Sequence, residues 1–154
     1  MGPLCEPGAK LLICDSKHVI RDRLWAGPHD RYHRPVRLAA VAATSERVRS
    51  TRSRNRKIEA LTEALRALSP AESEAGVAFL AGEPRQPKLG IGYAALRDIA
   101  PAPAAESSLT VAGLDAAFQQ IADASGPGSA TRRRQILERI LAAATASEQR
   151  LIRG

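Results

Sequence analysis

The sequence predicts an all-α fold, and three features support this. Hydrophobic residues make up 44% of the 154 residues but aromatic residues only 3%, so the core must consist of Ala, Leu, Ile and Val. Such a composition favours packed helices over a sheet sandwich. From residue 36 onward, apolar residues recur at the spacing of one helical face, and capping residues precede several of these segments. No strand pattern is longer than a few residues.

Three helices are predicted in the first half of this region. The first is expected to contain Leu38, Val41, Ala42 and Val48. The second follows Ser53, a suitable N-terminal cap. Its apolar residues share one helical face: Ile58, Leu61, Leu65 and Leu68. The sequence Ser69-Pro70-Ala71-Glu72 is a capping box with Pro at the first helical position, so a third helix is predicted to begin there and to stop at Gly82.

Four more helices are predicted in the second half. A short one covers Tyr93 to Ala100 before Pro101, and residues 101–108, PAPAAESS, form a linker. Thr110 can cap the next helix, whose expected buried residues are Val111, Leu114, Phe118 and Ile121. After the turn Gly126-Pro127-Gly128, a helix opens at Ser129 or Thr131, with buried Ile136, Leu137, Ile140 and Leu141. The last helix starts near Ser147.

Residues 1–35 differ from the rest, because they show no sustained helical period and hold both cysteines, all three histidines and four prolines. They are interpreted as a poorly structured N-terminal extension, either upstream sequence behind a mis-assigned start or a disordered basic arm. A zinc site would need Cys5, Cys14, His29 and His33. The spacing of the two cysteines is wider than in zinc fingers, so no metal site is predicted.

The charge of the chain indicates a polyanionic partner. Its net charge is +7 and its pI about 10.2, which favours nucleic acid first and a membrane surface second, although a GC-rich genome can also enrich Arg. No apolar stretch approaches the length of a membrane span, so a cytoplasmic, nucleoid-associated protein without a membrane partner is expected. Two basic clusters lie at predicted helix starts, where amides and Arg side chains can bind one phosphate. They are Arg47, Arg49, Arg52, Arg54, Arg56 and Lys57, and Arg132, Arg133 and Arg134.

A glycine-rich loop, GEPRQPKLGIGY at residues 82–93, is a further candidate for phosphate binding. Gly90 and Gly92 lack side chains, so the backbone there can approach a phosphate closely. Arg85 and Lys88 add positive charge. Contacts of this kind position a duplex without reading its bases. Leu89-Gly90-Ile91-Gly92 also looks like the hairpin of helix-hairpin-helix DNA-binding motifs.

Taken in order, three segments resemble the N-terminal DNA-binding domain of bacterial ATP-dependent DNA ligases. They are VAATSERVRSTRSRNRKIEALTEALRAL, VAFLAGEPRQPKLGIGYAALRDI and LTVAGLDAAFQQIADASGPGSATRRRQILERILAAATASEQRLIRG. The resemblance implies an irregular multi-helix domain over residues 36–154 that grips a nicked duplex mainly through phosphates. The implied backbone contacts are Arg85, Lys88, Gly90, Gly92, Ser129, Thr131, Arg132 and Arg133, with Arg54 and Lys57 as further candidates.

Two departures from the family pattern predict a chain that is inactive alone. Ligation needs a lysine that accepts AMP within Lys-x-Asp-Gly, and none of the four lysines stands in such a sequence. The ATP and Mg²⁺ of the intact family enzyme, and its catalytic domains, are therefore not expected here. The family also carries a second Gly-Glu-Leu-Arg-type segment beyond the position of Gly154, and Pro84 replaces the usual Leu of the first. A domain incomplete at its C-terminus is expected.

The resemblance assigns the chain a supporting role in strand sealing during DNA repair, replication or recombination. The alternatives are an independent small helical protein that binds DNA without sequence preference, and a scaffold protein that binds acidic proteins. An incomplete domain should expose apolar faces, for which Leu137, Leu141, Leu151 and Ile152 are the candidates.

Overall fold

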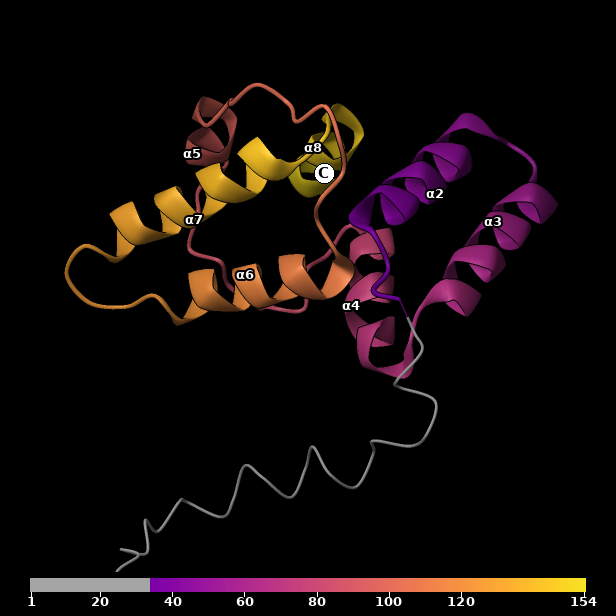
Figure 1. Cartoon of the computed structure of the whole chain (residues 1–154), viewed down its shortest axis with the longest axis horizontal. Coiled ribbons are helices and arrows are strands. Elements are labelled where there is room, and N and C mark those ends of the chain that lie inside the picture. The colour runs from indigo at the N-terminus through magenta and orange to yellow at the C-terminus, as the bar shows by residue number, and fades with distance from the viewer. Residues whose placement is uncertain (1–33) are drawn as a thin grey trace, which may run out of the picture. The chain divides into compact units, whose positions relative to one another are not determined.

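The computed structural model of the chain describes residues 34–154, apart from the side chains of Tyr93 and Ala95. Helices joined by loops make up this part of the chain (Figure 1), and its only β-type pairing is an isolated bridge between Arg37 and Thr110. The helices are α2 (Leu38–Ser50), α3 (Arg54–Ala67), α4 (Pro70–Ala81), α5 (Tyr93–Asp98), α6 (Val111–Asp123), α7 (Ser129–Ala143) and α8 (Ala146–Arg153). The all-α prediction is confirmed here, whereas the expectations for the cysteines and histidines fall outside the described residues.

The predicted caps define most of the helix starts. The Ser53 side chain accepts a hydrogen bond from the amide of Arg56 at 3.5 Å, and that of Thr110 accepts one from Gly113 at 3.0 Å. Ser69 forms its capping box at the start of α4, which ends at Gly82 in the left-handed conformation. These contacts satisfy amides and carbonyls that a helix end leaves without partners.

One hydrophobic core joins helices from both halves of the described region. Its fully buried side chains include Leu38, Val111, Leu114, Ile121 and Leu141. The rings of Phe79 and Phe118 meet edge to face at 5.9 Å between centroids and connect α4 to α6. Helix α2 packs against α3, α4 and α8, while α6 packs against α7 and α4.

The linker after α5 runs back to the beginning of α2 and closes the structure. The amide of Leu38 donates to the carbonyl of Leu109 at 2.9 Å, and that of Val111 donates to Val36 at 3.0 Å. Helix α5 stops at Asp98 rather than Ala100. A residue before proline disfavours the helical conformation, which explains why Ala100, before Pro101, is not helical.

Helix α8 begins with a capping box that the sequence analysis missed. Glu148 is fully buried, and its carboxylate accepts hydrogen bonds from the amide of Thr145 at 2.7 Å and its hydroxyl at 2.8 Å. The hydroxyl of Ser107 donates to the same carboxylate at 2.6 Å. The carboxylate therefore fixes the start of α8 and ties the linker to it.

One expectation about apolar faces needs correction. Leu137 and Leu141 are 2% and 0% exposed because they pack in the core, so the expectation that an incomplete domain exposes them is wrong. The apolar face of α3, in contrast, is largely uncovered: Ile58 is 51% and Leu65 44% exposed. Within residues 34–154, no helix is both long enough and apolar enough to cross a membrane.

Candidate nucleic-acid interface

The glycine-rich loop between α4 and α5 lies against α7. Gly90 has a positive φ of 64°. A Cβ atom at this position would stand 2.6 Å from Nη1 and 2.9 Å from Cζ of Arg133. Glycine adopts this φ without strain, and its lack of a Cβ leaves room for the Arg133 guanidinium. The fold therefore brings together two predicted phosphate-binding segments that are about forty residues apart in the sequence.

Arg133 connects α7 and the loop to the end of α6. Its Nε donates to the carbonyl of Ile121 at 3.2 Å, and its Nη2 donates to that of Ala124 at 2.5 Å. These two carbonyls lie at the C-terminal end of α6, where carbonyls have no partner within the helix. A guanidinium carries five N–H donors, so the side chain still has donors to spare. Its predicted contact with DNA stays a prediction, but its visible role is to join α6, α7 and the loop.

The N-terminus of α7 is the most open part of the site. Gly128 is the N-terminal cap and has no side chain to offer, while Gly126 and Gly128 have positive φ angles of 76° and 78°. The amides of Ser129 and Arg132 donate to the carbonyls of Gly126 and Gly128. Within residues 34–154, the intervening amide of Thr131 has no acceptor. Thr131 and Arg132 are exposed and Ser129 is half-buried, so this turn can accept an anion.

Arg85 and Lys88 occupy different environments in the same loop. Arg85 binds Asp115 of α6 through two contacts, Nη2 to Oδ2 at 2.6 Å and Nε to Oδ1 at 2.9 Å, and it contacts Glu74 at 3.3 Å. The hydrogen bond from Arg85 lowers the pKa of Asp115, burial opposes this, and Gln86 adds a second hydrogen bond. Lys88 is exposed. Lys88 therefore has its charge directed to solvent, while that of Arg85 is largely neutralised.

The basic cluster before and within α3 stands apart from the loop and α7. Figure 1 shows α3 and the N-terminus of α7 at opposite ends of the described region. Arg54 is exposed and Lys57 half-buried in the first turn of α3. Arg47 and Arg49, expected near a helix start, instead lie in the last turn of α2, where cations match the helix dipole. The predicted contacts thus form two separate surfaces.

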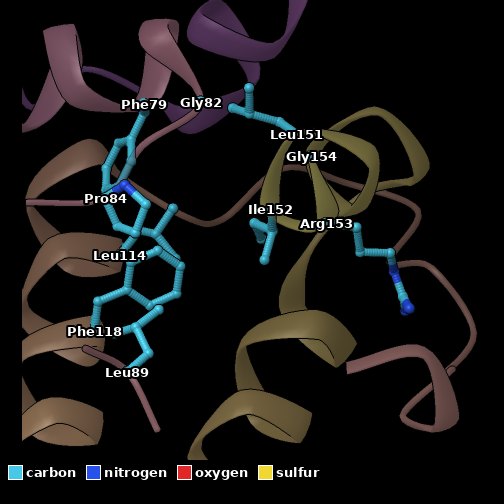
Figure 2. A pocket seen from close by; sticks show the side chains of 10 residues that line it. All are labelled: Phe79, Gly82, Pro84, Leu89, Leu114, Phe118, Leu151, Ile152, Arg153 and Gly154. Atoms are coloured by element: carbon cyan, nitrogen blue, oxygen red, sulfur yellow. The ribbon is translucent and has the colours of Figure 1, made fainter. Parts of the chain in front are cut away.

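A pocket of about 190 Å³ lies near the loop but carries no catalytic groups (Figure 2). Phe79, Pro84 and Phe118 form one side and Leu151 and Ile152 the other. The Arg153 guanidinium donates to the carbonyls of Leu96 and Ile99 at 3.1 and 2.8 Å. The pocket is an apolar space between packed elements. Within residues 34–154, no group of three or more His, Cys, Asp or Glu side chains could hold a metal ion.

Comparison with known proteins shows which family and which relatives the chain resembles. Residues 97–153 match the family described as DNA ligase N terminus. A probable DNA ligase of Beutenbergia cavernae is 49% identical over 117 residues, which is 76% of this chain and 23% of that protein. Residues 97–153 belong to the DNA ligase N-terminus family. Similar relatives are the probable DNA ligases of Mycobacterium marinum, 48% identical over 73% of this chain and 22% of that protein, and of Nocardia farcinica, 46% identical over 75% and 22%.

The chain thus spans less than a quarter of the length of these probable DNA ligases. The part that matches the DNA ligase N-terminus family contains α6, α7 and α8. Four of the predicted phosphate contacts lie in it: Ser129, Thr131, Arg132 and Arg133. The loop with Lys88 and Gly90 precedes the matched residues, but it packs directly on them through Arg133.

Proposed function

We propose that this chain binds double-stranded or nicked DNA through its phosphates, as part of an ATP-dependent DNA ligase. It holds the two ends of a nick in line while strands are sealed in DNA repair, replication or recombination. The observation that carries the proposal is the contact between Gly90 and Arg133, because it joins the glycine loop and the open N-terminus of α7 into one surface. The similarity to probable DNA ligases supports this role over that of an independent DNA-binding protein.

The chemistry of the surface suits contacts with the DNA backbone that do not read the bases. Lys88 and Arg132 supply exposed positive charge, Thr131 a free amide and a hydroxyl, and Gly90 and Gly92 an exposed backbone. Such groups fix the position of a duplex and are indifferent to its sequence. Arg85 assists indirectly, because its bonds to Asp115 fix the loop on α6. Arg54 and Lys57, at the far end of the described region, are secondary candidates.

Nucleotidyl transfer is assigned to other parts of the ligase. The Lys-x-Asp-Gly sequence that takes up AMP does not occur in these 154 residues, so ATP and Mg²⁺ would be bound by the catalytic domains. The net charge of +7 favours association with the nucleoid in the cytoplasm. The contribution of this chain is then positioning, which raises the effective concentration of the nick at the catalytic groups.

The test is a binding measurement with charge-neutral variants. Fluorescence anisotropy of a labelled duplex would be followed for wild-type protein, Lys88→Ala and Arg132→Ala. Each variant should weaken binding to unrelated duplex sequences to the same extent, because phosphates are common to all. Arg47→Ala is the matched control: it removes the same charge from a side chain that already binds Glu63 at 2.8 Å. Equal weakening by all three variants would show a general charge effect and contradict the assigned surface.

A further inference from the structure

The uncovered face of α3 is the most apolar exposed helix surface among the described residues. Among the described residues, only three large hydrophobic side chains are strongly exposed. Two of them, Ile58 and Leu65, lie on α3. They are seven residues apart, about two turns, and so share one face. Leu61 lies between them and is half-buried. Apolar side chains gathered on one face indicate an interaction site more strongly than scattered ones do.

The charges around this face are mostly positive. By helical spacing, Arg54 lies one turn before Ile58 on the same face, and Lys57 and Arg66 flank it on either side. By the same spacing, Glu63 of α3 points away from the stripe, whereas the exposed Glu59 lies beside Ile58 on the side of Arg66. Glu63 also binds Arg47 of α2 at 2.8 Å. The face is therefore an apolar stripe whose rim carries three cations and one carboxylate, a net positive charge.

We propose that this face docks an acidic amphipathic helix of a partner protein. The docking face is made of Arg54, Lys57, Ile58, Leu61, Leu65 and Arg66. Apolar side chains of the partner pack on Ile58 and Leu65, while its carboxylates meet the surrounding cations, as in other helix-on-groove complexes. The proposal stands independently of DNA binding at the N-terminus of α7, which lies at the opposite end of the described region (Figure 1).

Duplex DNA and a second copy of the chain fit this face less well. Duplex DNA could use Arg54 and Lys57, but phosphates gain nothing from the exposed side chains of Ile58 and Leu65. A second copy of the chain would bring two rims of net positive charge together, and like charges placed opposite each other oppose association. An acidic helix with apolar residues complements both properties of the face.

The probe is a fluorescein-labelled synthetic peptide with Leu at every third or fourth position and Glu elsewhere. A scrambled peptide of the same composition is the control for charge. We expect the amphipathic peptide to bind the full chain more tightly than the scrambled one, and more weakly as salt is raised. Ile58→Ser and Leu65→Ser should each weaken binding about tenfold or more, as for a central interface residue.

Val77→Ser is the matched control, because Val77 is 49% exposed, close to the 51% of Ile58, but lies on α4. It should leave peptide affinity unchanged. Circular dichroism would verify that all three variants remain helical. The proposal is overturned if the two peptides bind equally or not at all, or if Val77→Ser matches Ile58→Ser. It is also overturned if duplex DNA displaces the peptide from wild-type protein, or if sedimentation shows a dimer that Ile58→Ser dissociates.

Discussion

Replacing Gly90 by Ala should destabilise the chain more than the same change at Gly82. Both glycines have positive φ, 64° and 80°, so both substitutions force a side chain into the left-handed region. An added Cβ at Gly82 meets nothing within 4 Å, whereas at Gly90 it would meet the Arg133 guanidinium at 2.6 Å. The two positions therefore share the backbone cost and differ in the contact with Arg133.

The magnitudes follow from these two terms. The left-handed conformation costs a non-glycine residue about 1–2 kcal/mol, which is the whole expected effect of Gly82→Ala. At Gly90 the guanidinium must also move away from the carbonyls of Ile121 and Ala124. Losing one charge-assisted hydrogen bond there adds about 1.5–3 kcal/mol. Gly90→Ala should therefore lower the free energy of unfolding by about 2.5–5 kcal/mol, a large part of the stability of a typical domain.

Urea unfolding followed by circular dichroism at the helical band gives these free energies by linear extrapolation. A double-mutant cycle with Arg133→Ala isolates the contact. In the Arg133→Ala background the steric obstacle is gone, so Gly90→Ala should cost only the backbone term, about 1–2 kcal/mol. If Gly90→Ala and Gly82→Ala are equally destabilising, or if the cycle is additive, Arg133 does not hold the loop and the reasoning is refuted.

Two further predictions concern carboxylates. The lowered pKa of Asp115 means that its stabilisation is present above the unfolded pKa of about 3.9 and is lost as pH falls through the folded pKa. Asp115→Asn should thus lower the free energy of unfolding by about 1–2 kcal/mol at pH 7, and the stability of the variant should fall less steeply than that of wild type as the pH is lowered. Urea midpoints of the variant that run parallel to those of wild type from pH 7 to pH 2 would contradict this. Glu148→Ala should cost about 2–4 kcal/mol, because the donors of Thr145 and Ser107 lose their buried acceptor. The exposed Glu138→Ala is its control, expected within about 0.5 kcal/mol of wild type in the same unfolding assay.

Local signals predicted the helices well. Ser53, Ser69 and Thr110 each form the cap that their position in the sequence indicates, and Gly82 ends α4 as expected. Caps and apolar spacing act within a few residues, so a sequence reveals them directly. Thr145 and Glu148 show the same three-residue capping spacing and could have been found by the same rule.

The arrangement of the candidate interface was harder to predict from the sequence. Arg85 binds Asp115, thirty positions away, and Arg133 binds carbonyls at the end of a different helix. Nothing in the local sequence distinguishes these arginines from exposed Arg132, because the difference arises only when the loop and α7 pack on α6. The resemblance to ligases indicated the candidate segments, while the structure separates the arginines that hold them in place from the charges that face solvent.

The measurement that tests the central claim most directly is a titration of the purified chain onto nicked and intact duplexes of one sequence at several salt concentrations. We predict affinity that falls steeply with salt, with a logarithmic slope of about −0.9 per phosphate contact. Lys88→Ala and Arg132→Ala should each make that slope less negative by about 1. Folded protein that binds neither duplex, or slopes that these variants leave unchanged, would contradict the claim that the loop and the start of α7 grip the DNA backbone.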